Sequence, residues 1–350
     1  MKNFNKHIIN NTFSIKQALE KLNSFNSKDD LTLFVINENE QMIGTITDGD
    51  IRRGLLNGKN LNSSVMEIMF TQFRFLEKLN LSLDKVQYFR KLEINFIPIL
   101  DENKRILKIL DISENQSILP IDAVLMAGGK GERLKPLTET IPKPLLKVGQ
   151  KPIIEYNLDR LEHFGVENIW ISVRYLAEQI MEYLGNGSNK NLNIQYIKEE
   201  KPLGTAGSIS LINDFKHDVV LLMNSDLLTN IDFEDFYKTF IESEASMCIA
   251  TIPYKVSIPY AILETENHEV LDIKEKPSYI YQANAGLYLI QRKYLNLIPQ
   301  NSFFDAPDLV QELIKLGKKI SYYSILGYWL DIGKPEDYIK AQEDVNHIKF

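Results

Sequence analysis

A glycine-rich, cation-flanked segment follows a short apolar run about a third of the way along the chain. It spans residues 124–146 and reads VLMAGGKGERLKPLTETIPKPLL. Glycines let a backbone turn tightly and approach a ligand closely, and consecutive N–H groups in such a loop form an anion-binding concavity. Neighbouring cations add positive charge, so the segment predicts a cradle for a pyrophosphate group. The residues concerned are Gly128, Gly129, Gly131, Lys130, Arg133 and Lys143.

This loop differs from two common phosphate-binding patterns. The P-loop pattern G-x-x-x-x-G-K-[ST] is absent, and G-x-G-x-x-G fails because Leu134 stands where its last glycine belongs. A plain glycine turn with solvated charges remains the alternative interpretation. The strand-like run in front and the Pro-Lys-Pro sequence behind favour a phosphate site.

Two aspartates follow apolar runs later in the chain. Asp226 lies in MNSDLL, where the most apolar run ends, and Asp331 lies in YWLDIGKPEDY. A carboxylate at the end of a buried strand is costly unless it is paired, hydrogen-bonded or bound to a metal. A helix cap is the alternative for each of them.

The elements that must position these residues begin at Ile121. Short apolar runs alternate there with helical patterns such as 153–165, which predicts an α/β domain whose mostly parallel sheet is covered on both faces. Ligands of such sheets bind at the carboxyl ends of the strands. The expected strands are 121–126, 168–175, 192–199 and 218–226.

The first 115 residues have a different pattern, in which helix, strand, turn and strand occur twice. The helical runs are 14–23 and 82–93, and the sequence 113–120 lacks periodicity. We therefore expect an internal duplication, with copies at about 1–60 and 61–115. A linker is expected at 116–121, followed by the α/β domain at 122–350.

Composition limits the classes of protein that the chain can represent. The 350 residues carry a net charge of −7, which argues against a general nucleic-acid binder. The one cysteine, Cys248, excludes a disulfide within the chain and fits a reducing cytoplasm. The longest aliphatic runs are too short to span a bilayer, and residues 1–10 lack the apolar stretch of a signal peptide. We therefore expect a cytoplasmic protein with no membrane partner.

The segment from Leu125 to Leu146 resembles the signature of the sugar-1-phosphate nucleotidyltransferases, L-A-G-G-x-G-T-R-L-x-P-L-T-x-x-x-P-K-P-L. The resemblance continues to about Tyr338 and implies a Rossmann-like nucleotidyltransferase domain. Glu132 departs from it, since threonine or serine is usual there. The implied reaction is attack by a sugar 1-phosphate oxygen on the α-phosphorus of an NTP, with release of pyrophosphate. Arg133 would stabilise the triphosphate and Lys143 would hold phosphate oxygens.

The resemblance also implies a Mg²⁺ cofactor held by Asp226 and Asp331, a hard oxygen site completed by phosphate oxygens. The family commonly has glycine before the first aspartate, where this chain has Ser225. By the same resemblance EEKPLGTAGSI (199–209) packs beside the nucleobase. The expected nucleotide contacts are Met126, Ala127, Gly128, Gly129, Lys130, Gly131, Glu199, Leu203, Gly204, Thr205 and Ala206.

Base and sugar preference rest on fewer residues. A carboxylate at Glu199 suits guanine, whose N1–H and N2–H₂ are adjacent donors, whereas a solvated acidic turn is the alternative.

For the sugar, the resemblance implies that Glu275 accepts hydrogen bonds from hydroxyls and Lys276 pairs with the phosphate. Asn284 and Gly286 would line the pocket. SFFDAPDL (302–309) receives no role.

The segment MIGTITDGDIRR (42–53) resembles the end of a CBS (cystathionine-β-synthase) domain. In that family the residues matching Thr47 and Asp50 contact the ribose of an adenosine nucleotide. The duplication fits an α+β tandem CBS (Bateman) module that binds an adenine or guanine nucleotide, although the second copy lacks the glycine-threonine pair. A module that only pairs subunits is the alternative, and a homodimer is expected by analogy.

This order of domains resembles the bacterial glucosamine-1-phosphate guanylyltransferases that supply legionaminic acid synthesis. The leading hypothesis is therefore transfer of GMP from GTP to glucosamine 1-phosphate. Uridylyl or thymidylyl transfer to glucose 1-phosphate, and guanylyl transfer to mannose or heptose 1-phosphate, remain alternatives. A nucleotide-sensing regulator with an inactive transferase domain is an alternative of another class.

Overall fold

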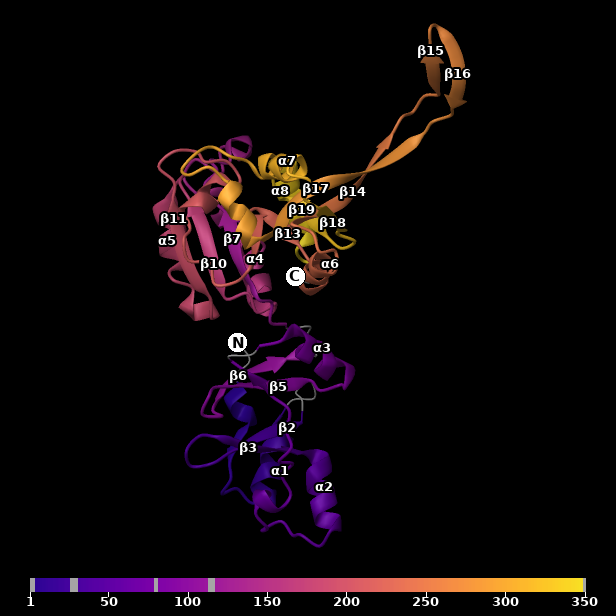
Figure 1. Ribbon diagram of the computed structural model, residues 1–350. Coiled ribbons are helices and arrows are strands. Elements are labelled where there is room, and N and C mark those ends of the chain that lie inside the picture. The colour runs from indigo at the N-terminus through magenta and orange to yellow at the C-terminus, as the bar shows by residue number, and fades with distance from the viewer. Residues whose placement is uncertain (1–3, 26–30, 79–80, 113–116, 349–350) are drawn as a thin grey trace. The chain divides into compact units, whose positions relative to one another are not determined.

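The chain divides into two compact units, Met1–Ile118 and Leu119–Phe350, in the computed structural model (Figure 1). The structure describes residues 4–25, 31–78, 81–112 and 117–348. Each unit has its own hydrophobic clusters and its own sheets. The two units are therefore described separately.

Unit 1 contains two three-stranded sheets of the same topology. In each, the first strand pairs with the second in parallel and the second pairs with the third in an antiparallel hairpin. A helix connects the two parallel strands, as the predicted duplication requires. The first copy comprises η1 (Phe4–His7), β1 (Ile8–Asn10), α1 (Ile15–Asn23), β2 (Thr32–Ile36), β3 (Met42–Thr47), α2 (Asp48–Leu56) and η2 (Val65–Glu67). The second comprises β4 (Leu76–Glu77), α3 (Leu83–Lys91), β5 (Phe96–Leu100) and β6 (Ile106–Asp111).

The two copies in unit 1 share part of their core. Each has a buried cluster of its own, and a third cluster joins Phe34 and Met42 of the first copy to Phe96, Leu100 and Ile109 of the second. Burial of this shared apolar surface stabilises the two copies as one unit.

Unit 2 is built on a seven-stranded sheet with the order β11-β10-β7-β12-β17-β14-β18. All neighbouring strands pair in parallel except that β17 is antiparallel to β12 and β14, which confirms the predicted α/β fold with a mostly parallel sheet. The strands are β7 (Ile121–Met126), β10 (Asn168–Val173), β11 (Asn193–Lys198), β12 (Val219–Asn224), β14 (Met247–Ser257), β17 (Ser278–Gln291) and β18 (Ile320–Ser324).

Short pairs of strands and ten helical segments complete the described part of unit 2. In the part of the chain that the structure describes, no helix is both long and apolar enough to cross a membrane. The strand pairs are β8 (Lys147–Val148) with β9 (Lys151–Pro152), β13 (Leu227–Thr229) with β19 (Trp329–Asp331), and β15 (Ile262–Glu266) with β16 (Glu269–Lys274). The α-helices are α4 (Ile153–His163), α5 (Ala177–Leu184), α6 (Phe233–Glu242), α7 (Ala306–Lys315) and α8 (Pro335–Asp344). The 3₁₀ segments are η4 (Glu132–Leu134), η5 (Lys143–Leu145), η6 (Ser188–Lys190), η7 (Gly207–Leu211) and η8 (Arg292–Leu297).

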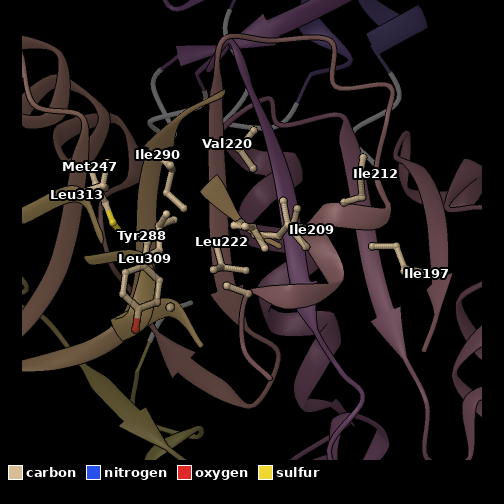
Figure 2. Close-up of a cluster of buried hydrophobic side chains, with 14 residues drawn as sticks. Ile197, Ile209, Ile212, Val220, Leu222, Met247, Tyr288, Ile290, Leu309 and Leu313 are labelled. Carbon is tan, nitrogen blue, oxygen red and sulfur yellow. The ribbon is translucent and has the colours of Figure 1, made fainter. Parts of the chain in front are cut away.

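A buried apolar cluster fixes the sheet of unit 2 against η7 and α7. Val220 and Leu222 of β12 and Tyr288 of β17 belong to it, together with Ile209 of η7 and Leu309 of α7 (Figure 2). Each fully buried aliphatic side chain contributes about 1.5–3 kcal/mol. The cluster holds the central strands rigidly under the ends at which the site lies.

The strands β14 and β17 extend beyond the sheet as a two-stranded ribbon, and β15 and β16 form a hairpin at its far end (Figure 1). We call residues 253–283 the arm. None of its residues is buried. The arm therefore adds nothing to the core of its own unit.

Asp122, fully buried in β7, ties this central strand to the loop before β12. Its carboxylate accepts hydrogen bonds from the backbone N–H of Lys216, at 2.7 Å, and of His217, at 2.9 Å. The His217 ring lies 3.1 Å from its second oxygen. The buried carboxylate is thus satisfied by backbone donors of the loop, as a buried charge requires.

We expect Asp122→Ala to lower the free energy of unfolding of unit 2 by about 2–4 kcal/mol, because two backbone N–H groups lose a buried, charged acceptor. Urea titration followed by tryptophan fluorescence measures this unit alone, since Trp170 and Trp329 are the only tryptophans of the chain. The control is Asp214→Ala at an exposed ion pair with Lys216, where the change should stay below about 1 kcal/mol. Equal effects of the two substitutions would contradict the assignment.

Candidate active site

The glycine loop leaves the carboxyl end of β7 between two parallel neighbours. Met126 lies opposite Ser172 of β10 and Asn224 of β12 in the strand registers, so the three strands end at one level. The N–H of Ala127 then donates to the carbonyl of Ser172 at 2.9 Å. The loop therefore begins where the rule for parallel sheets predicts a ligand.

Gly131 holds the loop against the Pro-Lys-Pro segment. Its φ of 63° is in the left-handed region, and a Cβ there would lie 2.9 Å from Cγ2 of Thr138 and 3.2 Å from Cβ of Lys143. The Thr138 hydroxyl donates to the Gly131 carbonyl at 2.8 Å. A Cβ on Gly129, in contrast, would meet no atom within 4 Å, which leaves that backbone open to a ligand.

Arg133 and Leu134 are adjacent but point to different surroundings. Leu134 is buried in a cluster with Leu228 of β13 and with Leu330 and Ile332 at β19. The exposed Arg133 carries its guanidinium to Gly333, whose added Cβ would lie 3.4 Å from an Nη atom. Thus Leu134, at the position of the missing third glycine, anchors the turn that aims Arg133 at Asp331.

The two predicted metal-binding aspartates lie side by side. The strands β13 and β19 pair so that Leu227 is opposite Asp331, and the N–H of Ile332 donates to the carbonyl of Asp226 at 3.2 Å. Residues 105 positions apart in the sequence thus share one short antiparallel ladder. Asp226 and Asp331 are therefore close enough to bind a common ion.

Lys143 provides the positive charge between these aspartates. Its Nζ donates to Oδ2 of Asp226 and lies 4.0 Å from Oδ1 of Asp331. The Oδ1 atoms of both aspartates are buried without a hydrogen-bond partner. Burial and the charge of Asp226 raise the pKa of Asp331, which Lys143 and Arg133 partly offset. Two carboxylates that face each other with unpaired oxygens favour an added cation.

These donors fit Mg²⁺, which takes one or two carboxylates together with phosphate and water oxygens. Among the described residues, no group of three or more His, Cys, Asp or Glu side chains converges on one point. The protein thus offers two carboxylates to such an ion and leaves its other coordination positions to a phosphate ligand and water. The identity of the ion stays a prediction.

Asn157 and Ser225 fix the turn that carries Asp226, and the sequence did not single out the asparagine. The Asn157 amide, buried on α4, donates to the carbonyls of Ser225 at 3.2 Å and of Leu227 at 3.0 Å. The Ser225 hydroxyl donates to the Met126 carbonyl at 2.6 Å. The serine that replaces the usual glycine therefore joins the ends of β12 and β7. A polar residue among the apolar positions of 153–165 was the available signal for Asn157.

Glu199 lies beside the glycine loop with its carboxylate already engaged. It accepts hydrogen bonds from the Ser172 hydroxyl and, at 3.1 Å, from the N–H of Leu203. A Cβ on Gly128 would lie 3.1 Å from its Oε1. A carboxylate has about four acceptor positions, so this fixed group can still accept from a ligand.

The second predicted nucleotide loop is tied to the segment that received no role. Asp305 accepts from the N–H of Thr205 at 2.8 Å and from its hydroxyl at 3.0 Å, while that hydroxyl accepts from the N–H of Ala306 at 2.8 Å. The N–H groups of Ala206 and Gly207 both donate to the Phe304 carbonyl at 2.9 Å. SFFDAPDL is thus the support on which the 203–206 loop rests.

A pocket of about 320 Å³ adjoins Asp331 and contains two of the predicted sugar contacts, Asn284 and Gly286. Gly286 has a φ of 76°, and its N–H donates to Oδ1 of Asn284 at 2.9 Å. The Asn284 amide donates to the Tyr288 hydroxyl at 2.6 Å. The other lining residues are Thr205, Asn224, Leu227, Ala285, Tyr288, Asp305, Pro307, Trp329 and Asp331.

Glu275 and Lys276, the other predicted sugar contacts, are not brought to this pocket. Both are exposed and lie on the arm between β16 and β17. In the β14–β17 register Asn284 pairs with Thr251 and Ser278 pairs with Ser257. Ser278 and Asn284 are therefore separated by six residues of extended strand, or about 20 Å. Their contact with sugar stays a prediction.

In unit 1, Thr47 and Asp50 form a capping box at the start of α2. The Thr47 hydroxyl donates to Oδ2 of Asp50 at 2.7 Å and accepts from the N–H of Asp50 at 3.3 Å. Arg53 Nη2 donates to Oδ1 of Asp50 at 2.5 Å. The pair therefore has a structural role, and its predicted contact with a nucleotide stays a prediction.

The fold and the site define an α/β protein with a glycine-rich loop beside an acidic pair. Residues 122–347 match the family described as Nucleotidyl transferase, so the chain belongs to that family. Residues 6–57 match the CBS domain. The resemblances seen in the sequence are thereby confirmed for the transferase domain and the first CBS copy.

The similarity to known proteins lies mainly in unit 2. The UTP–glucose-1-phosphate uridylyltransferase of Synechocystis sp. is 30% identical over 239 residues, covering 63% of this chain and 62% of that protein. The D-glycero-alpha-D-manno-heptose 1-phosphate guanylyltransferase of Aneurinibacillus thermoaerophilus is 28% identical over 231 residues. This match covers 65% of this chain and 99% of that protein. HddC from Yersinia pseudotuberculosis, whose crystal structure matches with a TM-score of 0.51, is 29% identical in sequence. This match covers 64% of this chain and 99% of that chain. The chain spans about half to two thirds of the length of the longer relatives.

Paired glycine variants test the packing of the loop. Gly131→Ala places a Cβ in a left-handed conformation against Thr138 and Lys143, so we expect the free energy of unfolding of unit 2 to fall by about 1–3 kcal/mol. Gly129→Ala, in open space, should change it by less than about 0.5 kcal/mol. Tryptophan fluorescence in urea measures both, and an equal loss would contradict the described packing.

Proposed function

We propose that the protein is a Mg²⁺-dependent sugar-1-phosphate nucleotidyltransferase that transfers GMP from GTP to glucosamine 1-phosphate. The observation that carries the proposal is the convergence of Arg133, Lys143, Asp226 and Asp331 at the glycine loop. Cations beside a glycine loop bind phosphates, and two carboxylates with unpaired oxygens suit a divalent ion.

The chain's contribution to the reaction is positioning and neutralisation of charge. The backbone N–H groups around Gly129 hold the triphosphate, and Arg133 stabilises the charge that develops on the departing pyrophosphate. Lys143 pairs with Asp226 and lies close to Asp331. Its ammonium group therefore holds phosphate oxygens beside the two carboxylates. When bound, Mg²⁺ screens the negative charge of the reacting phosphates. The sugar 1-phosphate oxygen then displaces pyrophosphate from the α-phosphorus without a covalent enzyme intermediate.

The preference for guanine rests on the fixed carboxylate of Glu199. It lies against Gly128, where a base following the phosphates would approach. Guanine offers it two adjacent donors, whereas uracil and thymine would present a carbonyl, and such a mismatch discriminates by about 10⁴. The name of the Aneurinibacillus relative supports guanylyl transfer, while that of the Synechocystis relative supports the alternative, uridylyl transfer to glucose 1-phosphate.

A substrate matrix tests the proposal. Pyrophosphate release is measured with GTP, UTP, CTP and dTTP, each combined with the 1-phosphates of glucosamine, glucose, mannose and heptose, with and without Mg²⁺. We expect Mg²⁺-dependent turnover with GTP and glucosamine 1-phosphate to exceed the rest by at least about tenfold. A preference for UTP overturns the assignment of the base. Nucleotide binding without turnover in any combination indicates a regulator instead.

Arg133→Ala should lower kcat about 10²–10³-fold, because one electrostatic contact to the developing charge is lost. The control is Lys135→Ala, which removes a neighbouring exposed cation and should leave kcat within about twofold. Steady-state assays at saturating substrate measure both. An Arg133→Ala enzyme with unchanged kcat, or two variants with equal losses, would show that Arg133 does not act on the phosphates.

A further inference from the structure

The arm, residues 253–283, exposes more apolar surface than a two-stranded ribbon can support. Ten of its large apolar or aromatic side chains are exposed, among them Tyr260, Leu271 and Ile280, which is 69% exposed. An isolated two-stranded hairpin is marginally stable in water, and contiguous exposed apolar surface marks an interaction site. The arm therefore presents the kind of surface that packs against another one.

The pocket beside Asp331 lacks positive charge. Its lining includes the carboxylates of Asp305 and Asp331 and, within the described residues, no lysine or arginine. Lys143, which lies outside this lining, is already paired with Asp226. A sugar 1-phosphate in this pocket, which the proposed function requires, would place a phosphate near two carboxylates without a cation on the sugar side.

The arm carries three lysines among five carboxylates, and two of these lysines are free to supply the charge that the pocket lacks. Lys255 and Lys276 form no ion pair with any residue that the structure describes, whereas Lys274 is paired with Glu264. Lys276 lies two residues beyond Ser278 and is thus more than about 20 Å of strand away from Asn284 in the pocket of its own chain. The charge of Lys276 complements the two carboxylates of the pocket, but the ribbon holds them apart.

Folding the arm back onto its own pocket would break the β14–β17 ladder. Seven residue pairs, from Thr251 with Asn284 to Ser257 with Ser278, join the two strands along this stretch. Docking of the intact arm onto a second copy keeps every one of these pairs. It also makes the contact reciprocal in a two-fold dimer, where each arm reaches the other pocket.

We propose that the arm of one chain docks onto the active site of a second copy and that Lys276 completes the partner's sugar-phosphate pocket. This inference rests on the proposed function for the identity of the ligand, although the docking itself does not require turnover. The predicted role of Glu275 and Lys276 then becomes compatible with their exposed position. The active unit is a dimer with two composite sites.

Complementation between two inactive chains tests the composite site. Lys276→Met leaves the pocket intact and Asp226→Asn leaves the arm intact, and we expect each homodimer to lose at least about tenfold in turnover. Co-expression with two different tags allows the heterodimer to be purified. It contains one site with neither substitution, so we expect about half of the wild-type turnover per dimer.

Two results overturn the composite site once the wild-type enzyme is active. One is a heterodimer that is no more active than its parents, as expected when each arm serves its own chain. The other is a wild-type protein that is fully active as a monomer, measured by light scattering at the assay concentration. Restored activity in the heterodimer supports the proposal, since neither parent can supply it alone.

Cross-linking separates the docking from the reaction. One tagged chain carries Glu275→Cys on the arm and the other carries Pro307→Cys at the pocket, while native Cys248 is buried. A short bis-maleimide should join the two chains, whereas Glu242→Cys on α6 should give at least about tenfold less product with the same arm variant. No link between chains overturns the docking. A link in a protein that is inactive with every substrate pair overturns the proposed function alone.

Discussion

The mutual repulsion of Asp226 and Asp331 is the constraint around which the site is built. The short β13–β19 ladder holds the two carboxylates together, although like charges in a partly buried place disfavour each other. Lys143 offsets part of this cost, and Arg133 approaches from the glycine loop. One oxygen of each aspartate still lacks a partner. The described residues alone therefore leave two carboxylate oxygens without a partner, and the proposed cation with its phosphate ligand would satisfy them.

Much of this arrangement could be predicted from the sequence because parallel sheets place strand ends together. The apolar runs predicted β7 and β12, so the glycine loop and Asp226 had to meet at one edge. Asp331 required the resemblance as well, since no local pattern joins residues 105 positions apart. Asn157 and Asp305 escaped notice because the hydrogen bonds of their side chains reach across 68 to 100 residues. Their side chains support backbone segments, and such support leaves no pattern of spacing.

The position of the arm could not be predicted for a different reason. A hairpin has the same alternation and turn residues whether it covers its own domain or projects from it. The motif around Glu275 and Lys276 predicted contacts with the sugar and its phosphate. It did not indicate the direction in which the hairpin projects from the domain. Likewise, Thr47 and Asp50 match a nucleotide-binding pattern and a helix cap equally well, because both need a hydroxyl and a carboxylate three residues apart. Spacing alone does not distinguish the two uses.

Gly286 belongs both to the pocket and to the root of the arm. Between the pairs Ile249–Tyr288 and Thr251–Asn284, β17 advances four residues while β14 advances two, and the irregularity encloses Gly286 with its φ of 76°. Such bulges bend a ribbon and increase its twist. A side chain at this position would collide with Asn224, so it would distort the floor of the pocket and re-aim the arm at once. Evolution of substrate choice at this point is consequently bound to evolution of the direction in which the arm projects.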